Sequence, residues 1–398
     1  MESRLEARHG AGMTLRVLSI FGTRPEAVKM APVVQALSCK PEIVSLVCVT
    51  AQHRQMLDQV LGLFNIHPDV DLNLMQPDQN LASLTADIFT HLDPVLVSLK
   101  PDWILVQGDT TTVMASSLAA YYRHIRVGHV EAGLRTNDKW QPFPEEINRR
   151  LASVVTDLHF APTEWARQNL LRENIPSQQI VVTGNPVIDA LQAVVHMPAT
   201  PAVLDLFKRI DIPYHSSDSS YEASPGSPRL ILVTAHRREN FGEPLEHICS
   251  ALKKLAHIYQ DGIRIVYPVH LNPNVQEPVH RILDNTPNII LLEPMDYLPM
   301  VHLMRRASLV LTDSGGLQEE APSLGIPVLV MRLVTERPEG IQAGTVRLVG
   351  TDPDRIVNQA CHLLDDPQAY AAMAQAINPY GDGKAAMRIA NAILDEGA

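Results

Sequence analysis

The sequence has few cysteines and no long apolar segment. Its four cysteines (Cys39, Cys48, Cys249 and Cys361) are scattered through 398 residues without a CxxC pair. Such spacing is typical of buried, reduced thiols and not of a disulfide framework or a zinc site. No apolar run approaches the ~18–20 residues that a membrane span needs, and residues 1–12 lack the apolar core of a signal peptide. We therefore expect a cytoplasmic protein that does not enter membranes.

Positive charge is also scarce. Lys and Arg number 33 against 44 Asp and Glu, which gives a formal net charge of −11. A general nucleic-acid binder needs a basic surface that displaces counterions, so we expect no nucleic-acid partner. The sequence also lacks an HExxH motif, a GxSxG motif and a convincing set of metal ligands, which argues against zinc-protease and serine-hydrolase chemistry.

From Leu15 onward, short apolar runs alternate with amphipathic helical stretches, for example 26–37, 110–122 and 145–155. The first series of expected strands comprises 15–20, 43–49, 102–107, 126–130, 157–161 and 180–183. The second series comprises 229–234, 263–267, 288–292, 308–312, 327–331 and 346–349. Strands that are apolar almost throughout and alternate with helices indicate parallel sheets covered on both faces. The pattern predicts an α/β fold with two doubly wound, Rossmann-like domains.

Two segments lie between the two series of strands. The proline-bearing segment 196–201 is expected to be the domain linker, and the Ser-rich segment 216–228 a surface insertion. In doubly wound sheets, ligands bind beyond the carboxyl ends of the strands. Two such domains joined by a linker predict a central cleft between those edges, so candidate functional residues are sought at strand ends.

Polar residues follow several strands of the first series. Arg24 and Lys29, at the start of a helix, are suited to attract an anion, although an ordinary βα turn with surface charges explains them as well. Asp109 is either a site residue or a helix N-cap. Glu145 stands in a first helical turn, where the helix dipole favours acids. Glu131 is harder to explain structurally, because strands disfavour Glu. Clustered acids raise one another's pKa, as proton-transfer sites require.

The second series carries complementary groups. Residues 235–240 form a cationic cluster after a strand, where a phosphate can bind. Residues 309–320 are expected to form a strand (309–312) followed by a small-residue turn and a helix start (313–320), without the GxGxxG spacing or the Walker lysine. Glu320 is placed to accept hydrogen bonds from a ribose diol, and the alternative is a capped helix with solvated acids. His270 is equally well explained as a core histidine, as are most others, among them His53, His91 and His124.

Several long motifs follow one another along residues 15–391, and together they indicate membership of a known family. They include FGTRPEAVKMAP, TAQHRQMLDQV, GDTTT, GHVEAGLRT, TGNPVIDAL, HRREN, YPVHLNPNV, LTDSGG and TERPEG. In these motifs the sequence resembles the non-hydrolysing UDP-N-acetylglucosamine 2-epimerases of the bacterial type. The resemblance implies a GT-B fold with domains at 14–190 and 200–378, a C-terminal helix at 380–398 that returns to the first domain, a homodimer, and neither cofactor nor metal.

The resemblance also implies residue roles at matching positions. The family's catalytic residues correspond to Asp109, Glu131, Glu145 and His236. Its substrate-binding residues correspond to Arg24, Lys29, Met295, Met300, Ser314, Gly315, Gly316, Glu320 and Arg337. Several members bind a second UDP-GlcNAc as an activator, at positions that match Gln52, Gln55, Arg237 and His270. Asp78 stands where some members have a basic residue in that activator site.

The implied reaction is reversible epimerisation of UDP-N-acetylglucosamine (UDP-GlcNAc) to UDP-N-acetylmannosamine (UDP-ManNAc) for cell-envelope polysaccharide. It proceeds by anti elimination of UDP to 2-acetamidoglucal and syn re-addition. The sequence leaves four alternatives open: a hydrolysing epimerase that releases free N-acetylmannosamine and UDP, an epimerase for a modified UDP-sugar such as a 2,3-diacetamido uronate, a GT-B glycosyltransferase, and a UDP-sugar sensor without catalytic activity.

Overall fold

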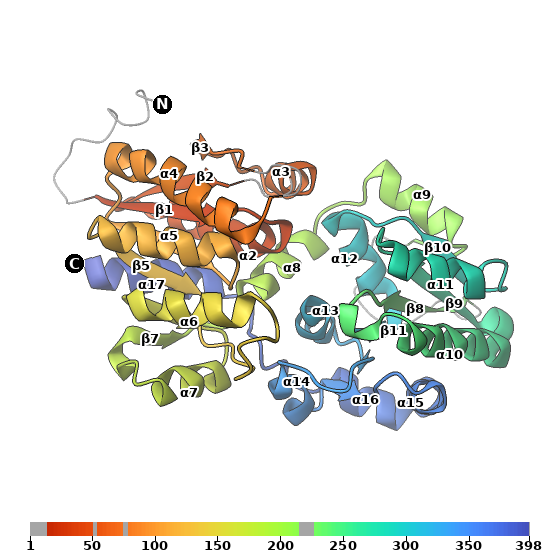
Figure 1. Cartoon of the computed structure of the whole chain (residues 1–398). Helices are drawn as coiled ribbons and strands as arrows, with labels where there is room; N and C mark the ends of the chain where they lie inside the picture. The colour runs from red at the N-terminus through yellow and green to blue at the C-terminus, as the bar shows by residue number, and fades with distance from the viewer. Residues whose placement is uncertain (1–13, 51–53, 75–78, 215–226, 398) are drawn as a thin grey trace. The chain divides into compact units, whose positions relative to one another are not determined.

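The computed structural model describes residues 14–50, 54–74, 79–214 and 227–397, which form two α/β units (Figure 1). The first unit comprises the chain up to Ala190 together with Tyr380–Ala398, and the second is Leu191–Pro379. The boundary falls within helix α8 (Pro186–Val195). The proline-bearing segment 196–201 follows α8 and lies in the second unit. Most of the expected Ser-rich insertion, residues 216–226, lies outside the described residues.

Within its described residues, the first unit contains a seven-stranded parallel sheet of order β3-β2-β1-β4-β5-β6-β7. The strands are β1 (Leu15–Phe21), β2 (Ile43–Val49), β3 (Val70–Asp71), β4 (Trp103–Gln107), β5 (Arg126–Val130), β6 (Leu158–Ala161) and β7 (Ile180–Val182). The helices are α2 (Arg24–Ser38), α3 (Arg54–Leu63), α4 (Leu81–Leu99), α5 (Thr111–Tyr122), α6 (Glu145–Val155), α7 (Glu164–Arg172), the first half of α8, and α17 (Ala385–Gly397). Because β1, β4 and β5 are neighbours, the segments that follow them lie at one edge.

The C-terminal helix α17 belongs to the first unit and packs against α2. Its first turn is fixed by Asp189, whose carboxylate accepts hydrogen bonds from the amides of Ala385 (3.2 Å) and Ala386 (2.9 Å). Carboxylates at a helix N-terminus complement its unpaired N–H groups and its dipole. Ile389 and Ile393 of α17 are fully buried, so the end of the chain is part of the core of the first unit.

The second unit contains, in the part that the structure describes, a six-stranded parallel sheet of order β10-β9-β8-β11-β12-β13. The strands are β8 (Arg229–Thr234), β9 (Ile263–Pro268), β10 (Ile289–Leu292), β11 (Ala307–Thr312), β12 (Val328–Val330) and β13 (Val346–Leu348). The helices are α9 (Pro201–Arg209), α10 (Glu243–Tyr259), α11 (Pro273–Leu283), α12 (Tyr297–Arg306), α13 (Gly315–Glu320), α14 (Pro338–Ala343), α15 (Pro353–Asp365) and α16 (Pro367–Ala374). Strands β8 and β11 are paired, so their following turns are adjacent.

The expected α/β fold with two parallel sheets is confirmed. Each strand expected from the sequence is present, with ends shifted by no more than one residue. All four thiols are free, as expected. Cys48 and Cys249 are buried, but the expectation of burial is wrong for Cys39, which is exposed. Among the described residues, no helix has both the length and the apolar character needed to cross a bilayer.

Candidate functional site

The carboxylate of Glu131 is the centre of a polar cluster in the first unit. Glu131 directly follows β5 and has a φ of 63°, a left-handed conformation that non-glycine residues rarely adopt. Its Oε1 accepts hydrogen bonds from Lys29 Nζ (2.5 Å) and Asn185 Nδ2 (2.8 Å), and its Oε2 accepts one from Gln107. Strained conformations persist where the surroundings hold them and are common at functional sites. Lys29 was expected to attract an anionic ligand, but its ammonium group forms an ion pair with the carboxylate of Glu131.

Asp109 lies close to this cluster, after β4. The N-cap of α5 is Thr110, so the interpretation of Asp109 as a helix cap is wrong. Burial raises the pKa of the Asp109 carboxyl; the positive charge of Arg149 opposes this rise, and the negative charges of Glu131 and Glu145 add to it. Arg149 Nη2 lies 3.5 Å from Asp109 Oδ2. The structure therefore brings the three expected catalytic acids into one electrostatic group.

The two acids at the start of α6 have different environments. Glu146 is fully buried and accepts hydrogen bonds from the amides of Thr136 (3.0 Å) and Asn137 (3.2 Å) and from Arg150 Nε (3.1 Å). Glu145 has a buried Oε2 with no hydrogen-bond partner among the described residues. The helix dipole accounts for the position of both acids, but only Glu145 keeps an oxygen available for a ligand.

Glu26 is a further acid at this edge, which the sequence did not single out. It is buried, and its Oε2 accepts hydrogen bonds from the amides of Gly22 (2.9 Å) and Thr23 (2.7 Å), while its Oε1 accepts one from Thr110 Oγ1 (2.6 Å). Burial raises its pKa despite these bonds. Glu26 thus joins the turn after β1, where the half-buried Arg24 begins α2, to the start of α5.

In the second unit, the turns after β8 and β9 place two histidines, His236 and His270, side by side. The rings of His236 and His270 are stacked, with centroids 5.4 Å apart. Burial lowers the pKa of His236; the carboxylate of Asp313 opposes this change, and Arg237 and His270 add to it. His270 is exposed, so its interpretation as a core histidine is wrong.

The turn between β11 and α13 lies against an arginine. Ser314 is the N-cap of α13, and a Cβ on Gly315 would lie 2.5 Å from Nη1 of Arg337. The Arg337 guanidinium donates to Glu319 Oε1 (2.5 Å) and Glu336 Oε1 (2.6 Å). Burial alone raises the pKa of Glu336, but Arg337 and a second arginine bring it down to about 2. Glycine at 315 is therefore needed for the guanidinium to pack against this turn.

Glu320, expected to bind a ribose, ends α13. It is buried, and its Oε1 accepts a hydrogen bond of 2.5 Å from the hydroxyl of Tyr297. Gly316 lies beside the same carboxylate, because a Cβ there would be 3.4 Å from Glu320 Oε2. Met295 and Met300, the expected contacts of the base, are half-buried on either side of Tyr297 along the chain. Tyr297 is thus a neighbour of the expected ribose site.

The remaining expected residues are only partly described. Gln52 and Asp78 lie outside the described residues, and of Gln55 the structure describes only the backbone, in α3. Arg237 and His270, the other expected activator residues, lie beside His236. His53 is also outside the described residues.

Most histidines for which burial was expected do not lie in the core. His91 and His124 are exposed. The fully buried pair is instead His129 and His159, on adjacent strands, where burial lowers their pKa to about 4 and about 3.

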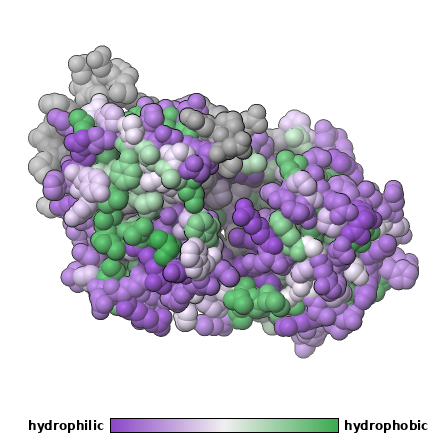
Figure 2. All heavy atoms as spheres, viewed as in Figure 1, coloured by the Kyte–Doolittle hydropathy of each residue, from purple (hydrophilic) through white to green (hydrophobic). Residues whose placement is uncertain are grey.

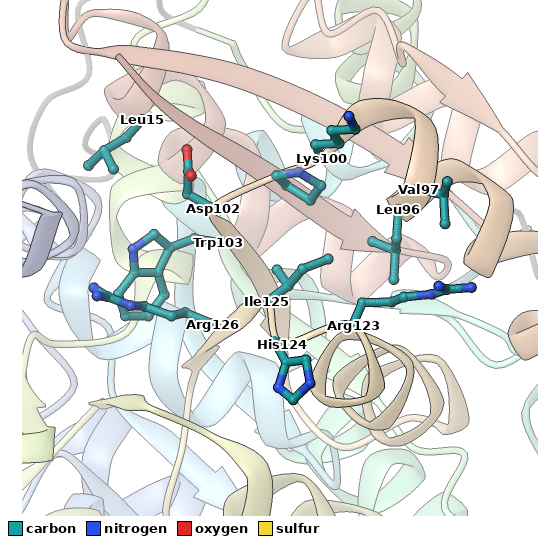
Figure 3. Close-up of a pocket in the computed structure, with 11 residues that line it drawn as sticks. Leu15, Leu96, Val97, Lys100, Asp102, Trp103, Arg123, His124, Ile125 and Arg126 are labelled. Carbon is teal, nitrogen blue, oxygen red and sulfur yellow. The ribbon is translucent and has the colours of Figure 1, made fainter. Parts of the chain in front are cut away.

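A cavity of about 630 Å³ lies at the opposite edge of the first sheet (Figure 3). Leu15, Trp103 and Arg126, which line it, begin β1, β4 and β5, whereas the acids follow the other ends of these strands. None of the expected site residues lines this cavity. Among the described residues, no group of three or more His, Cys, Asp or Glu is arranged to hold a metal ion.

Two Rossmann-like units with polar strand ends, acidic in one and bearing histidine and arginine in the other, define a GT-B-fold enzyme. A family model described as UDP-N-acetylglucosamine 2-epimerase matches residues 35–394. The UDP-N-acetylglucosamine 2-epimerase of Salmonella typhimurium is 57% identical over 379 residues, which cover 95% of this chain and 98% of the relative. The chain belongs to the UDP-N-acetylglucosamine 2-epimerase family, whose members are isomerases.

Solved structures agree with this assignment. The UDP-GlcNAc 2-epimerase of Neisseria meningitidis, bound to UDP-GlcNAc, is 48% identical with a TM-score of 0.85, over 96% of this chain and 100% of that one. The Methanocaldococcus jannaschii UDP-GlcNAc 2-epimerase, in complex with UDP-GlcNAc and UDP, is 31% identical with a TM-score of 0.79, over 96% of this chain and 100% of that one. The likeness extends through both units.

Proposed function

We propose that the protein interconverts UDP-GlcNAc and UDP-ManNAc in the cytoplasm by inverting C2 of the sugar. The observation that carries the proposal is the group of three carboxylates, Asp109, Glu131 and Glu145, in one electrostatic environment within a chain of this family. A binding protein or glycosyltransferase has no evident need for this group of acids, whereas proton transfer at a carbon atom does.

The substrate's C2 hydrogen is weakly acidic, because no carbonyl is adjacent to it. Departure of UDP changes this, since breaking the C1–O bond leaves positive charge on C1 beside C2. A base then takes the C2 proton, the C–H electron pair forms the C1=C2 double bond of 2-acetamidoglucal, and UDP leaves with the C1–O pair. For re-addition, UDP oxygen attacks C1 and an acid protonates C2 from the opposite face. Atoms and electrons balance without an added oxidant or reductant.

The described side chains divide naturally between these tasks. The carboxylates of the first unit stabilise the positive ring and move protons, and a raised pKa at Asp109 suits a group that holds a proton during turnover. In the second unit, His236, Arg337 and the turn at Ser314–Gly316 bind the diphosphate, and Glu320 binds the ribose. Positive and hydrogen-bonding groups that face a departing phosphate stabilise its growing charge.

Incubation with UDP-GlcNAc in deuterated water tests the function. We expect proton NMR to show loss of the C2 hydrogen signal and appearance of UDP-ManNAc, with the anomeric carbon of the product bonded to UDP. Free N-acetylmannosamine with UDP would instead identify a hydrolysing enzyme. Binding without exchange would identify a sensor, and exchange only with a modified UDP-sugar would identify that substrate. Inversion without solvent hydrogen, or only with added nicotinamide, would contradict the mechanism.

We also propose that two copies associate through helices α5 and α6 of the first unit. These helices pack against each other, and Figure 2 shows a hydrophobic patch over this region. Leu151 and Val154 of α6 are 51% and 80% exposed, and Tyr121 and Tyr122 at the end of α5 are exposed as well. Exposed apolar patches mark interaction surfaces, and a two-fold interface between identical chains is the commonest arrangement.

Size-exclusion chromatography with light scattering checks the association. We expect wild-type protein at twice the chain mass of 44.0 kDa, and the double variant Leu151→Glu, Val154→Glu at the single-chain mass. The buried charges would cost far more than the apolar contact they replace. Ile377→Glu is the matched control, because Ile377 is 85% exposed in the second unit. A monomeric wild-type protein, or an unchanged double variant, would contradict this interface.

A further inference from the structure

A buried carboxylate in the second unit, Asp313, connects the ends of β8 and β11. Its amide donates to the carbonyl of Thr234 (3.0 Å). Its Oδ2 accepts hydrogen bonds from the amides of His236 and Arg237, both at 2.8 Å, and from Asn240 Nδ2 at 3.0 Å. Asp313 is 0% exposed. Three donors on one oxygen fix the orientation of the carboxylate and the course of the turn that carries His236.

The other oxygen of Asp313 faces the imidazole of His236. Oδ1 lies 3.7 Å from His236 Nδ1, and although it is buried it has no hydrogen-bond partner among the described residues. Buried carboxylate oxygens are normally satisfied by a donor. The Nδ1 atom of His236, 3.7 Å away, lies just beyond hydrogen-bond distance of this oxygen and can donate to it if the ring moves closer.

We propose that Asp313 is the positioning residue of His236. Its Oδ2 holds the 235–237 turn, and its Oδ1 keeps the imidazole proton on Nδ1, so that Nε2 is the nitrogen available to a ligand. A carboxylate paired with one ring nitrogen fixes the tautomer and orientation of a histidine in this way. The His236 side chain is 37% exposed, which leaves the ring accessible. The inference rests on the proposed function only in identifying that ligand as the departing diphosphate.

The other charged groups around His236 act against its protonation. Arg237 follows it in the chain, and His270 is stacked on its ring. His270 Nδ1 accepts a hydrogen bond from the amide of Asn272 (3.1 Å), so a neutral His270 carries its proton on Nε2. Burial, Arg237 and His270 lower the pKa of His236, and Asp313 is the group that raises it. Loss of this carboxylate charge therefore makes the imidazolium form less stable.

The variant Asp313→Asn removes the negative charge of the carboxylate and keeps the size and shape of the side chain. Asn keeps an oxygen for the two backbone amides, but its amide nitrogen cannot accept the Nδ1 proton. We expect the pKa of His236, followed by proton NMR of the ligand-free full-length protein with His236→Asn for assignment, to fall by about one unit. We expect kcat for C2 exchange to fall about 100-fold with KM changed by less than about threefold, since binding groups remain in place.

Two further variants keep the test decisive. Asn240→Ala removes one donor from the same carboxylate but leaves its charge, and we expect an unshifted His236 titration. Asp313→Glu keeps a charge at the site, and we expect a pKa closer to wild type than that of Asp313→Asn. A wild-type titration in Asp313→Asn, or an equal shift in Asn240→Ala, would overturn the inference. The titration of His236 needs no substrate. If the wild-type protein had no epimerase activity, that result would contradict the proposed function but not the positioning role of Asp313.

Discussion

Asp109→Asn is expected to reduce C2 hydrogen exchange by about 1,000-fold, within the range that positioned acids and bases contribute. The substitution preserves the shape of the side chain and removes its ability to hold or release a proton. Burial raises the pKa of Asp109, and the negative charges of its neighbours Glu131 and Glu145 add to this rise. Glu131 is not free to substitute for it, since its carboxylate is held by Lys29 and Asn185. The rate of deuterium incorporation at C2, read by proton NMR, measures the effect.

The fold is expected to tolerate this change. Asn148 Nδ2 donates to the backbone carbonyl of Asp109 (3.0 Å), a bond that the side-chain substitution leaves intact. Removal of a negative charge beside Glu131 and Glu145 also relieves repulsion. Asp205→Asn makes the same chemical change at an exposed ion pair of α9 and is expected to retain wild-type exchange. Wild-type exchange in Asp109→Asn would exclude Asp109 from the proton transfer.

The strands were predictable because their apolar character is nearly continuous. Residues 230–234 and 103–106 bury both faces of their strands, so short apolar runs between helices marked them directly. Strand β3 was missed because it contains only two residues, Val70 and Asp71, neither of them buried. A strand of this length exists through its pairing with β2, and pairing of distant segments leaves no periodic signal in the sequence.

The site was predictable where strand order alone brings residues together. Asp109 and Glu131 follow adjacent strands, so two acids at strand ends were expected to meet. Asn185 reaches Glu131 from the segment after β7, which lies two strands away from β5 in the sheet. Only the folded sheet shows that contact. From the sequence, Asp313 was interpreted as part of a phosphate-binding turn. Its carboxylate in fact accepts hydrogen bonds from the amides of the turn after β8, and this contact depends on the pairing of β8 with β11.

The second large effect is expected at Gly133, two residues after Glu131. Gly133 has a φ of 94°, and a Cβ there would lie 2.3 Å from the carbonyl oxygen of Ala166 in α7. The obstacle is backbone, so no side chain can move aside. Gly133→Ala therefore combines strain at a positive φ with a backbone collision, and each of these typically costs about 1–3 kcal/mol. We expect the free energy of unfolding of the first unit to fall by about 3 kcal/mol or more.

Calorimetry of the full-length protein measures this effect as a lowered melting transition of the first unit, by about 10 °C for a unit of this size. Exchange at C2 is expected to fall as well, because displacement of Gly133 moves the backbone that holds Glu131 in its left-handed conformation. Gly62→Ala is the control: nothing lies within 4 Å of the added Cβ, Gly62 is inside α3, and Ala favours helix over Gly by about 1 kcal/mol. The control should melt at or slightly above the wild-type temperature. A Gly133→Ala variant that melts at the temperature of the control would contradict the prediction and show that α7 yields to the added methyl group.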